Sequence, residues 1–189
     1  MPSPKLRPGS GLIFMKVGTH AREPLPDIIA RKRREIEEAG RSFWGYGGAT
    51  CHPLTTVQPF ARDFVKRDGV IYLCMQPMDS HHFALPARAR EYSADGVKWQ
   101  TIPDKINVRG SRYALIVDDL RQEEFELPLE RTRVAVGNSV GRPGSEYITG
   151  RVDKACLEFV EGAASDETRS THIGLVARLV EPYAVLVRS

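Results

Sequence analysis

GLIFMKV, the stretch from Gly11 to Val17, has the apolar density of a buried β-strand, and a Gly-Thr-His turn follows it. Next, Asp27 stands directly after Pro-Leu-Pro and is expected to cap a helix that runs to about Ala39. Gly40 supplies the stop, because glycine readily adopts the left-handed conformation that ends many helices. A core strand followed by a helix therefore opens the fold.

The predicted helix carries both apolar and charged residues. Its apolar residues fall on one side, so that this side is expected to pack against the rest of the protein. These residues are Leu25, Ile28, Ile29 and Ile36. The basic run Arg31-Lys32-Arg33-Arg34 is followed at once by Glu35, Glu37 and Glu38. We expect a solvated helix face here; a patch that contacts phosphates is the alternative.

Strand patterns outnumber helix patterns in the rest of the chain. A short helix is expected from Val57 to Arg67, and a strong strand from Val70 to Met75. Further strands are predicted at Ala87–Tyr92, Val97–Trp99 after a Ser93–Gly96 turn, Tyr113–Val117, Phe125–Leu129, Arg133–Val136, Ile173–Val180 and Ala184–Arg188. Val152–Val160 fits either a helix or a strand. The pattern predicts an α+β fold: a mostly antiparallel, partly closed sheet or small barrel with two early helices packed on it.

The composition is that of an ordinary globular protein. The chain has 189 residues, 41% of them hydrophobic and 27% charged, and its net charge of +3 favours an anionic partner only slightly. We expect a flexible segment at residues 1–10 and a single globular domain at 11–189. No signal-like or membrane-spanning stretch is seen, and the three cysteines form no CxxC pair, so a cytoplasmic location with reduced thiols is expected.

Special residues are densest between Ser42 and Pro53, where three glycines stand among three aromatic residues. Interior glycines disfavour a helix, so we expect a shaped loop. Trp44 and Tyr46 offer flat faces on which a base can stack, and the glycines let backbone amides approach a ligand. Equally, Trp44 could plug the end of a barrel. Trp99 could form a second wall of the same pocket or belong to the core.

Three segments resemble the PUA-like superfamily, in particular its EVE and YTH branch. They are Trp44-Gly45, Phe60-Ala61-Arg62-Asp63-Phe64-Val65 and Asp68-Gly69-Val70-Ile71-Tyr72-Leu73. Proteins of that branch bind nucleic acids or modified bases in a pocket walled by aromatic side chains. The resemblance implies that Trp44, Tyr46 and Trp99 lie near such a pocket.

Other residues could carry chemistry. Cys51 would be a nucleophile if a base such as His52 or another histidine lowered its pKa, although adjacent side chains on an extended chain point apart. A buried structural cysteine beside a surface histidine is the simpler interpretation. Cys51, His52, His81 and His82 lack the spacing of a zinc site, so no metal is predicted. Asp118-Asp119 after a strand could hold a cation, but strands commonly end in such a turn.

Two functions from different classes follow. The first is a binding module for a nucleobase, including a modified one within nucleic acid, in an aromatic pocket with arginines on phosphates. Its expected ligand-binding residues are Trp44, Tyr46, Trp99, Arg62 and His81. The second is a small hydrolase or transferase that acts on a nucleotide-like anion through Cys51 or a nearby histidine. The sequence predicts no cofactor and identifies no protein partner.

Overall fold

The structure is a computed structural model, and it describes residues 4, 6–47, 52–81, 84–150, 152–162 and 169–189. Within them the strands are β1 Gly11–Thr19, β2 Ser42–Gly45, β3 Tyr72–His81, β4 Glu91–Ser93, β5 Gln100–Thr101, β6 Tyr113–Pro128, β7 Thr132–Val134, β8 Lys154–Phe159 and β9 Ser170–Arg188. The helices are α1 Leu25–Ala39, α2 Gln58–Asp68 and the short α3 Gly144–Tyr147. Single helical turns span Pro53–Val57 (π), Leu129–Arg131 and Gly137–Ser139 (both 3-10).

The nine strands that the described residues form belong to one sheet, whose main path runs β2-β6-β9-β3-β1-β8-β7, with β4 on β9 and β5 on β4. Every pair is antiparallel except β1 with β3, which are parallel. Parallel neighbours need a long connection, and α1, β2 and α2 supply it here. The expected α+β class with a mostly antiparallel sheet is confirmed. The path stays open, because its end strands β2 and β7 are not paired with each other.

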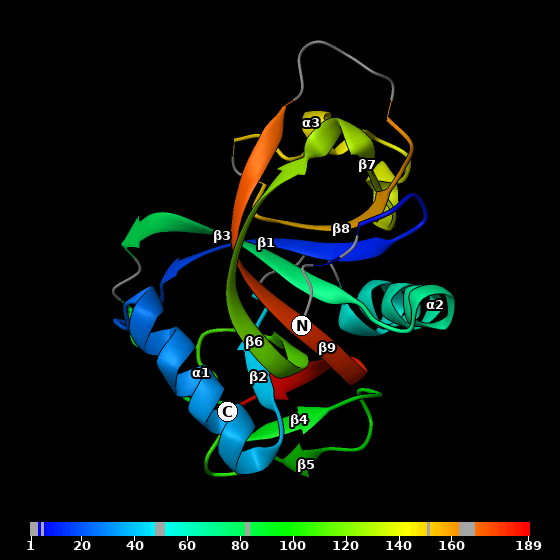
Figure 1. Cartoon of the computed structure of the whole chain (residues 1–189). Helices are drawn as coiled ribbons and strands as arrows, with labels where there is room; N and C mark the ends of the chain where they lie inside the picture. The colour runs from blue at the N-terminus through cyan, green and yellow to red at the C-terminus, as the bar shows by residue number, and fades with distance from the viewer. Residues whose placement is uncertain (1–3, 5, 48–51, 82–83, 151, 163–168) are drawn as a thin grey trace.

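Alternation along β1 explains how the sheet is covered. Ile13 packs into a core shared with both long helices, whereas its neighbours Leu12 and Phe14 pack into a second core on the opposite face. In Figure 1, α1 lies beside β2 and β6, while α2 lies at the right, beside β1 and β3. The second core lies under β7, β8 and α3 at the top of the same view.

The two early helices follow the sequence signals closely. α1 begins at Leu25, and its N-cap is Pro24, three residues before the expected cap at Asp27, which instead lies in the first turn. Gly40 ends it at φ 74°, and the Gly40 N–H donates to the carbonyl of Ile36. Gly69 ends α2 in the same way at φ 76°.

Other boundaries differ from the prediction. Ser42–Gly45, expected as part of a loop, is strand β2, because it pairs with Ala114–Val117 of β6. The ambiguous segment around β8 is a strand, since it pairs with β1 on one side and β7 on the other. The Ser93–Gly96 turn leads to a strand at Gln100–Thr101 and not at Val97–Trp99. The two predicted C-terminal strands are one continuous strand, β9.

Among the described residues no helix has the length and apolar character needed to cross a membrane.

Gly11 provides a stability test, because a Cβ placed on it would overlap the ring of Phe64 in α2. We expect Gly11→Ala to lower the free energy of unfolding in urea by about 1 to 3 kcal/mol, the usual cost of overpacking a core. Phe64→Leu replaces the ring with a smaller side chain, so in that background Gly11→Ala should lower the free energy of unfolding by less. A double-mutant cycle measures the difference. If Gly11→Ala lowered the free energy of unfolding equally in the wild type and in Phe64→Leu, overlap with the Phe64 ring would not be the cause of the loss.

Candidate functional site

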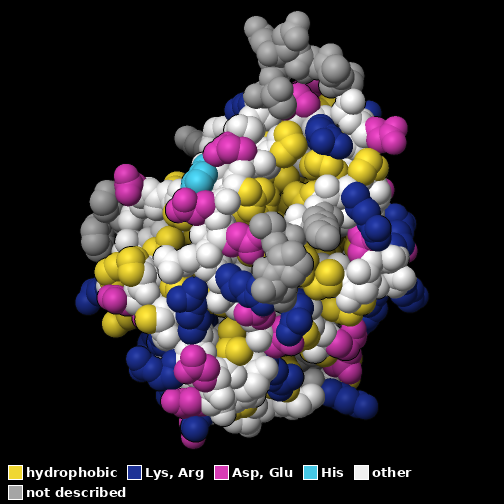
Figure 2. Space-filling view, in the orientation of Figure 1, with side chains coloured by type: hydrophobic (Ala, Val, Ile, Leu, Met, Phe, Trp, Pro, Cys, Tyr) yellow, Lys and Arg dark blue, Asp and Glu magenta, His cyan; other side chains and the backbone are white. Residues whose placement is uncertain are grey.

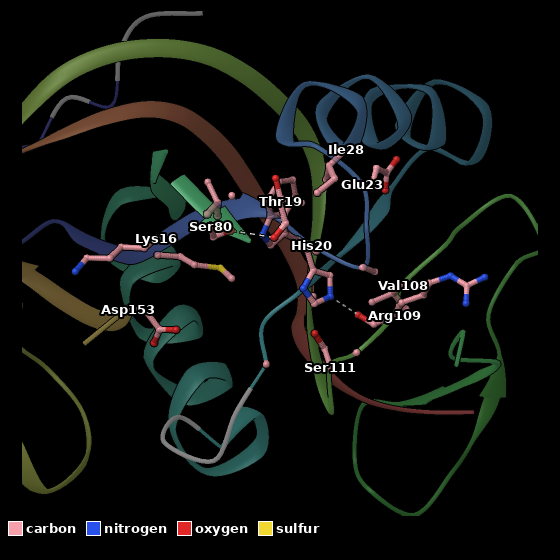
Figure 3. A pocket seen from close by; sticks show the side chains of 18 of the residues that line it. Lys16, Thr19, His20, Glu23, Ile28, Ser80, Val108, Arg109, Ser111 and Asp153 are labelled. Carbon is pink, nitrogen blue, oxygen red and sulfur yellow. Dashed lines mark hydrogen bonds between the residues drawn. The ribbon is translucent and has the colours of Figure 1, made fainter. Parts of the chain in front are cut away.

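A pocket of about 830 Å³ opens where β1 and β3 end. Its walls are completed by residues of α1 and β2, by the segment 107–111, and by Gly150, Asp153 and Lys154. Figure 3 shows Lys16 and Asp153 at one end of this pocket, His20 in its centre, and Glu23 and Arg109 towards the other end. The volume lies within the usual range for ligand pockets, about 300 to 1,000 Å³. We therefore take it as the candidate site.

A tight turn between β1 and α1 shapes the pocket. Ala21 and Arg22 have φ values of 49° and 66°, which are uncommon for residues with a side chain. Reciprocal backbone hydrogen bonds of 3.0 and 2.9 Å between His20 and Glu23 close this turn. The expected Gly-Thr-His turn is thus displaced, since β1 continues through Thr19. Residues held in sparsely populated backbone regions often lie at functional sites.

His20 joins this turn to the loop at 107–111. Its Nε2 lies 2.8 Å from the carbonyl oxygen of Arg109, a contact drawn as a dashed line in Figure 3. Gly110 follows at φ 69°, and a Cβ there would come within 2.8 Å of Pro86 and 3.0 Å of the His20 Nε2. Only glycine fits at this position, both for its backbone angle and for its close neighbours.

Behind the pocket lies a buried charge cluster formed by Lys32 and Glu35 of α1, each only 3% exposed. The Lys32 Nζ donates to Glu35 Oε2 at 3.0 Å, to the Phe43 carbonyl at 2.5 Å and to the Asn107 carbonyl at 2.7 Å. The Glu35 carboxylate also accepts from the Ser42 hydroxyl at 2.5 Å and the Asn107 N–H at 3.0 Å. Burial lowers the pKa of Lys32 to about 8, and the attraction of Glu35 opposes that shift.

This cluster corrects the expectation that the basic run of α1 is a solvated face. Lys32 points inward, and Arg31 is fully engaged: it donates to Glu23 through Nε and Nη2 and to Glu35 and the Asn107 carbonyl through Nη1. Two of the cations that line the pocket therefore have few donors left for a ligand.

Three other cations at the pocket are only weakly engaged. Lys16 has one contact, 3.4 Å to the Gly150 carbonyl, and Arg109 donates to the Pro86 carbonyl at 2.9 Å. Neither pairs with a carboxylate among the described residues. Lys154 meets Asp153 at 3.3 Å, although its own side chain is only 12% exposed. These three cations, Lys16, Arg109 and Lys154, are the groups best placed to meet an anion.

The structure separates the predicted aromatic residues. Trp44 lines the pocket from β2, but it is only 5% exposed, so it offers a small part of its ring. Tyr46 is 2% exposed and packs in the core, with the Lys154 Nζ 5.8 Å from its ring centroid. Trp99 is not among the residues lining the pocket; the Arg188 guanidinium lies 3.9 Å over its ring. The three aromatics do not form one pocket.

The remaining predicted residues lie elsewhere or outside the description. Arg62 is an exposed residue of α2 that pairs with Glu181 at 2.8 Å. His52 caps the π-helical turn, its Nδ1 accepting from the Leu54 N–H at 3.2 Å. Cys51 lies outside the described residues, as does the side chain of His81, whose backbone ends β3. The proposal that Cys51 is a nucleophile therefore stays a prediction.

Metal-ligating residue types and the buried cysteine Cys74 are also present in the described part of the chain. No group of three metal-ligating side chains is found there. Asp118 and Asp119 are engaged instead by Arg178 at 2.7 Å and Arg121 at 2.5 Å. Burial raises the pKa of Cys74 to about 12, so this thiol stays protonated at neutral pH.

Sequence reasoning missed Lys16, His20, Arg109 and Lys154, because no local pattern groups four residues that far apart in the chain. The inward side of α1 did carry a signal. Ile28, Lys32 and Glu35 are spaced four and three residues apart, which places the two charged side chains on the same side of the helix as a buried isoleucine.

Comparison of the chain with protein-family models, with curated proteins and with solved structures finds no match.

The buried Lys32 allows a test by pH. The pKa of Lys32 is about 8 in the folded protein and 10.5 for an ordinary lysine. Between pH 8 and pH 10.5 the unfolded protein therefore binds a proton that the folded protein does not. Stability must then rise with pH across that window, at no more than about 1.4 kcal/mol per pH unit. We expect the difference in unfolding free energy between the wild type and Lys32→Met to rise from pH 8 to pH 10. Urea titrations at several pH values measure it, and a difference that stays flat or falls would contradict a depressed pKa.

Proposed function

We propose that the pocket binds a nucleobase together with the anionic phosphate attached to it, as a nucleotide unit of nucleic acid. The observation that carries the proposal is the combination, in one pocket of about 830 Å³, of an aromatic side chain with three weakly engaged cations, Lys16, Arg109 and Lys154. A nucleotide unit combines a flat ring, which can contact an aromatic side chain, with a phosphate, which cations attract.

The distribution of charge supports an anionic ligand. The pocket is lined by more cations than carboxylates: Lys16, Arg31, Lys32, Arg109 and Lys154 against Glu23 and Asp153. Since Glu23 is held by Arg31 at 2.6 Å, it repels an incoming anion less than a free carboxylate would. A concave surface with this excess attracts anions and speeds their association.

That the flat group of the proposed ligand is a nucleobase is supported by Trp44 and by the resemblance to the PUA-like superfamily. Because Trp44 is mostly buried, we propose that it contacts the base with the exposed part of its ring, without the second aromatic wall that Trp99 was expected to form. Gly45 and Gly47 beside Trp44 also line the pocket, and the absence of their side chains lets Ser111 and Lys154 lie close to this strand.

Blocking the pocket tests the proposal. Met78 lines the pocket and is 45% exposed, so Met78→Trp can add bulk there without disturbing the core. We expect the wild type to bind short single-stranded oligonucleotides and Met78→Trp to weaken that binding at least tenfold, measured by fluorescence anisotropy.

The matched control is Val97→Trp, which adds a similar bulk at a residue that is 80% exposed and does not line the pocket. It should leave the affinity unchanged. The proposal fails if the wild type binds no nucleotide or oligonucleotide, or if both variants bind as the wild type does.

The weakly engaged cations allow a second test, through salt. For single strands, each phosphate contact contributes about 0.7 to the slope of log affinity against log salt concentration. Lys16→Gln and Arg109→Gln should each weaken binding by a similar factor for all base sequences and reduce that slope by about 0.7. Lys98→Gln, at an exposed position that does not line the pocket, should change neither quantity. If the slope of log affinity against log salt concentration equals that of the wild type in all three variants, Lys16 and Arg109 do not contact phosphates of the ligand.

A further inference from the structure

Five consecutive residues, Asn107–Ser111, form one side of the pocket; we call them the pocket wall. They belong to no helix or strand, and their pairing with a neighbouring segment is limited to a single β-bridge between Arg109 and Arg88. Yet the wall carries Arg109, one of the three weakly engaged cations, and it faces His20 across a 2.8 Å contact. Something must hold this irregular segment in place.

At its first residue the wall is held by side chains of α1. The Asn107 N–H donates to Glu35 Oε1 at 3.0 Å. The Asn107 carbonyl accepts from the Lys32 Nζ at 2.7 Å and from Arg31 Nη1 at 3.0 Å. Both backbone polar groups of one residue are therefore satisfied by charged side chains of a helix more than 70 positions earlier in the chain.

The same two side chains hold the strand next to the wall, since Gly45 of β2 lies against Ser111 and Val108. Lys32 also donates to the Phe43 carbonyl, and Glu35 accepts from the Ser42 hydroxyl, and both of these residues lie in β2 just before Trp44. The Lys32–Glu35 pair thus links the wall to the strand that carries the aromatic residue. Its hydrogen bonds hold these two neighbouring segments together.

Stability alone does not account for a buried ion pair at this place. Removing two charges from water is costly, and apolar residues of similar size often stabilise a core equally well or better. What the pair does that apolar residues cannot do is bind main-chain groups of two segments in one geometry.

We infer that Lys32 and Glu35 are positioning residues of the pocket, which act on a ligand only through the wall and β2. The inference rests on the proposed function for its ligand, and on the hydrogen bonds above for its mechanism. Without the pair, the wall is held by Arg31 on the Asn107 carbonyl at 3.0 Å, by His20, by the Ala89 N–H on the Val108 carbonyl at 2.9 Å and by Arg109 on the Pro86 carbonyl. None of these contacts binds the Asn107 N–H, and Arg31 alone remains on its carbonyl.

The test is the double variant Lys32→Met/Glu35→Met. Its matched control is Arg34→Met/Glu37→Met, which makes the same charge change at the same spacing on the exposed side of α1. Hydrogen exchange of the Asn107 and Ala89 amides reports on the wall, and the Leu120 amide in β6 reports on global unfolding. In the test variant we expect hydrogen exchange at the Asn107 and Ala89 amides to accelerate at least tenfold more than at the Leu120 amide. In the control variant, exchange at all three amides should change equally.

Ligand binding is the second measurement, with the same single-stranded oligonucleotide and with Lys16, Arg109 and Lys154 intact. We expect at least a tenfold loss of affinity in the test variant and none in the control. The fluorescence of Trp44, isolated in a Trp99→Phe background, should shift in the test variant alone. If the double variant does not fold, Glu35→Gln replaces it, since it keeps the shape and removes the charge.

The outcomes separate this inference from the proposed function. The positioning role would be overturned if exchange at the Asn107 and Ala89 amides accelerated no more than at Leu120 in the test variant. It would also be overturned if these two amides exchanged faster but the affinity for the oligonucleotide stayed unchanged. A wild type that binds no oligonucleotide would overturn the proposed function, while exchange and Trp44 fluorescence would still decide whether the pair holds the wall.

Discussion

The parallel pairing of β1 with β3 is the constraint on which the rest of the structure depends. Register from Leu12 opposite Tyr72 to Lys16 opposite Gln76 forces the chain to cross over between the strands, and the crossover contains both long helices. It also brings the carboxyl ends of the two strands to one edge of the sheet. Ligands of open sheets with parallel strands commonly bind at such an edge, and the pocket lies there.

The long strands β6 and β9 complete this arrangement from the other side. β9 contributes Ile173 to the core under β8, Leu175 to the helix-covered core and Val187 to a third core beneath β4. One strand thus ties together all three apolar clusters. The pocket is lined by residues of β1, β2, β3 and β8, by α1 and by connecting segments.

On the face of the molecule drawn in Figure 2, charged side chains of both signs are scattered among the other residues.

Local patterns predicted the parts of this fold that local chemistry decides. The apolar run of β1, the glycine stops at Gly40 and Gly69 and the buried strand at Tyr113–Val117 all follow from residues next to one another. Elements decided by distant partners were missed. The Glu181-Pro182 step suggested a turn, but β9 continues through it with a register shift opposite Ile116.

The candidate site was predictable only in part, for the same reason. Trp44 lines the pocket, whereas Trp99, for which a second wall or a place in the core was considered, does not line it and lies under the Arg188 guanidinium at the C-terminal end of β9. Lys16 and Lys154 line the same pocket because β1 pairs with β8, although the two strands are far apart in the chain. No composition or spacing rule encodes such a contact in a single sequence.

The contacts made by Asn107 have a consequence for how this protein can change. Lys32 and Glu35 bind its peptide N–H and carbonyl and not its side chain, so the anchor needs at position 107 only a residue with a backbone N–H that fits the partly buried space of Asn107. The anchoring of this segment is thereby separate from the chemistry of the other side chains that line the pocket. Changes among those side chains can alter the lining without removing the hydrogen bonds that hold the segment in place.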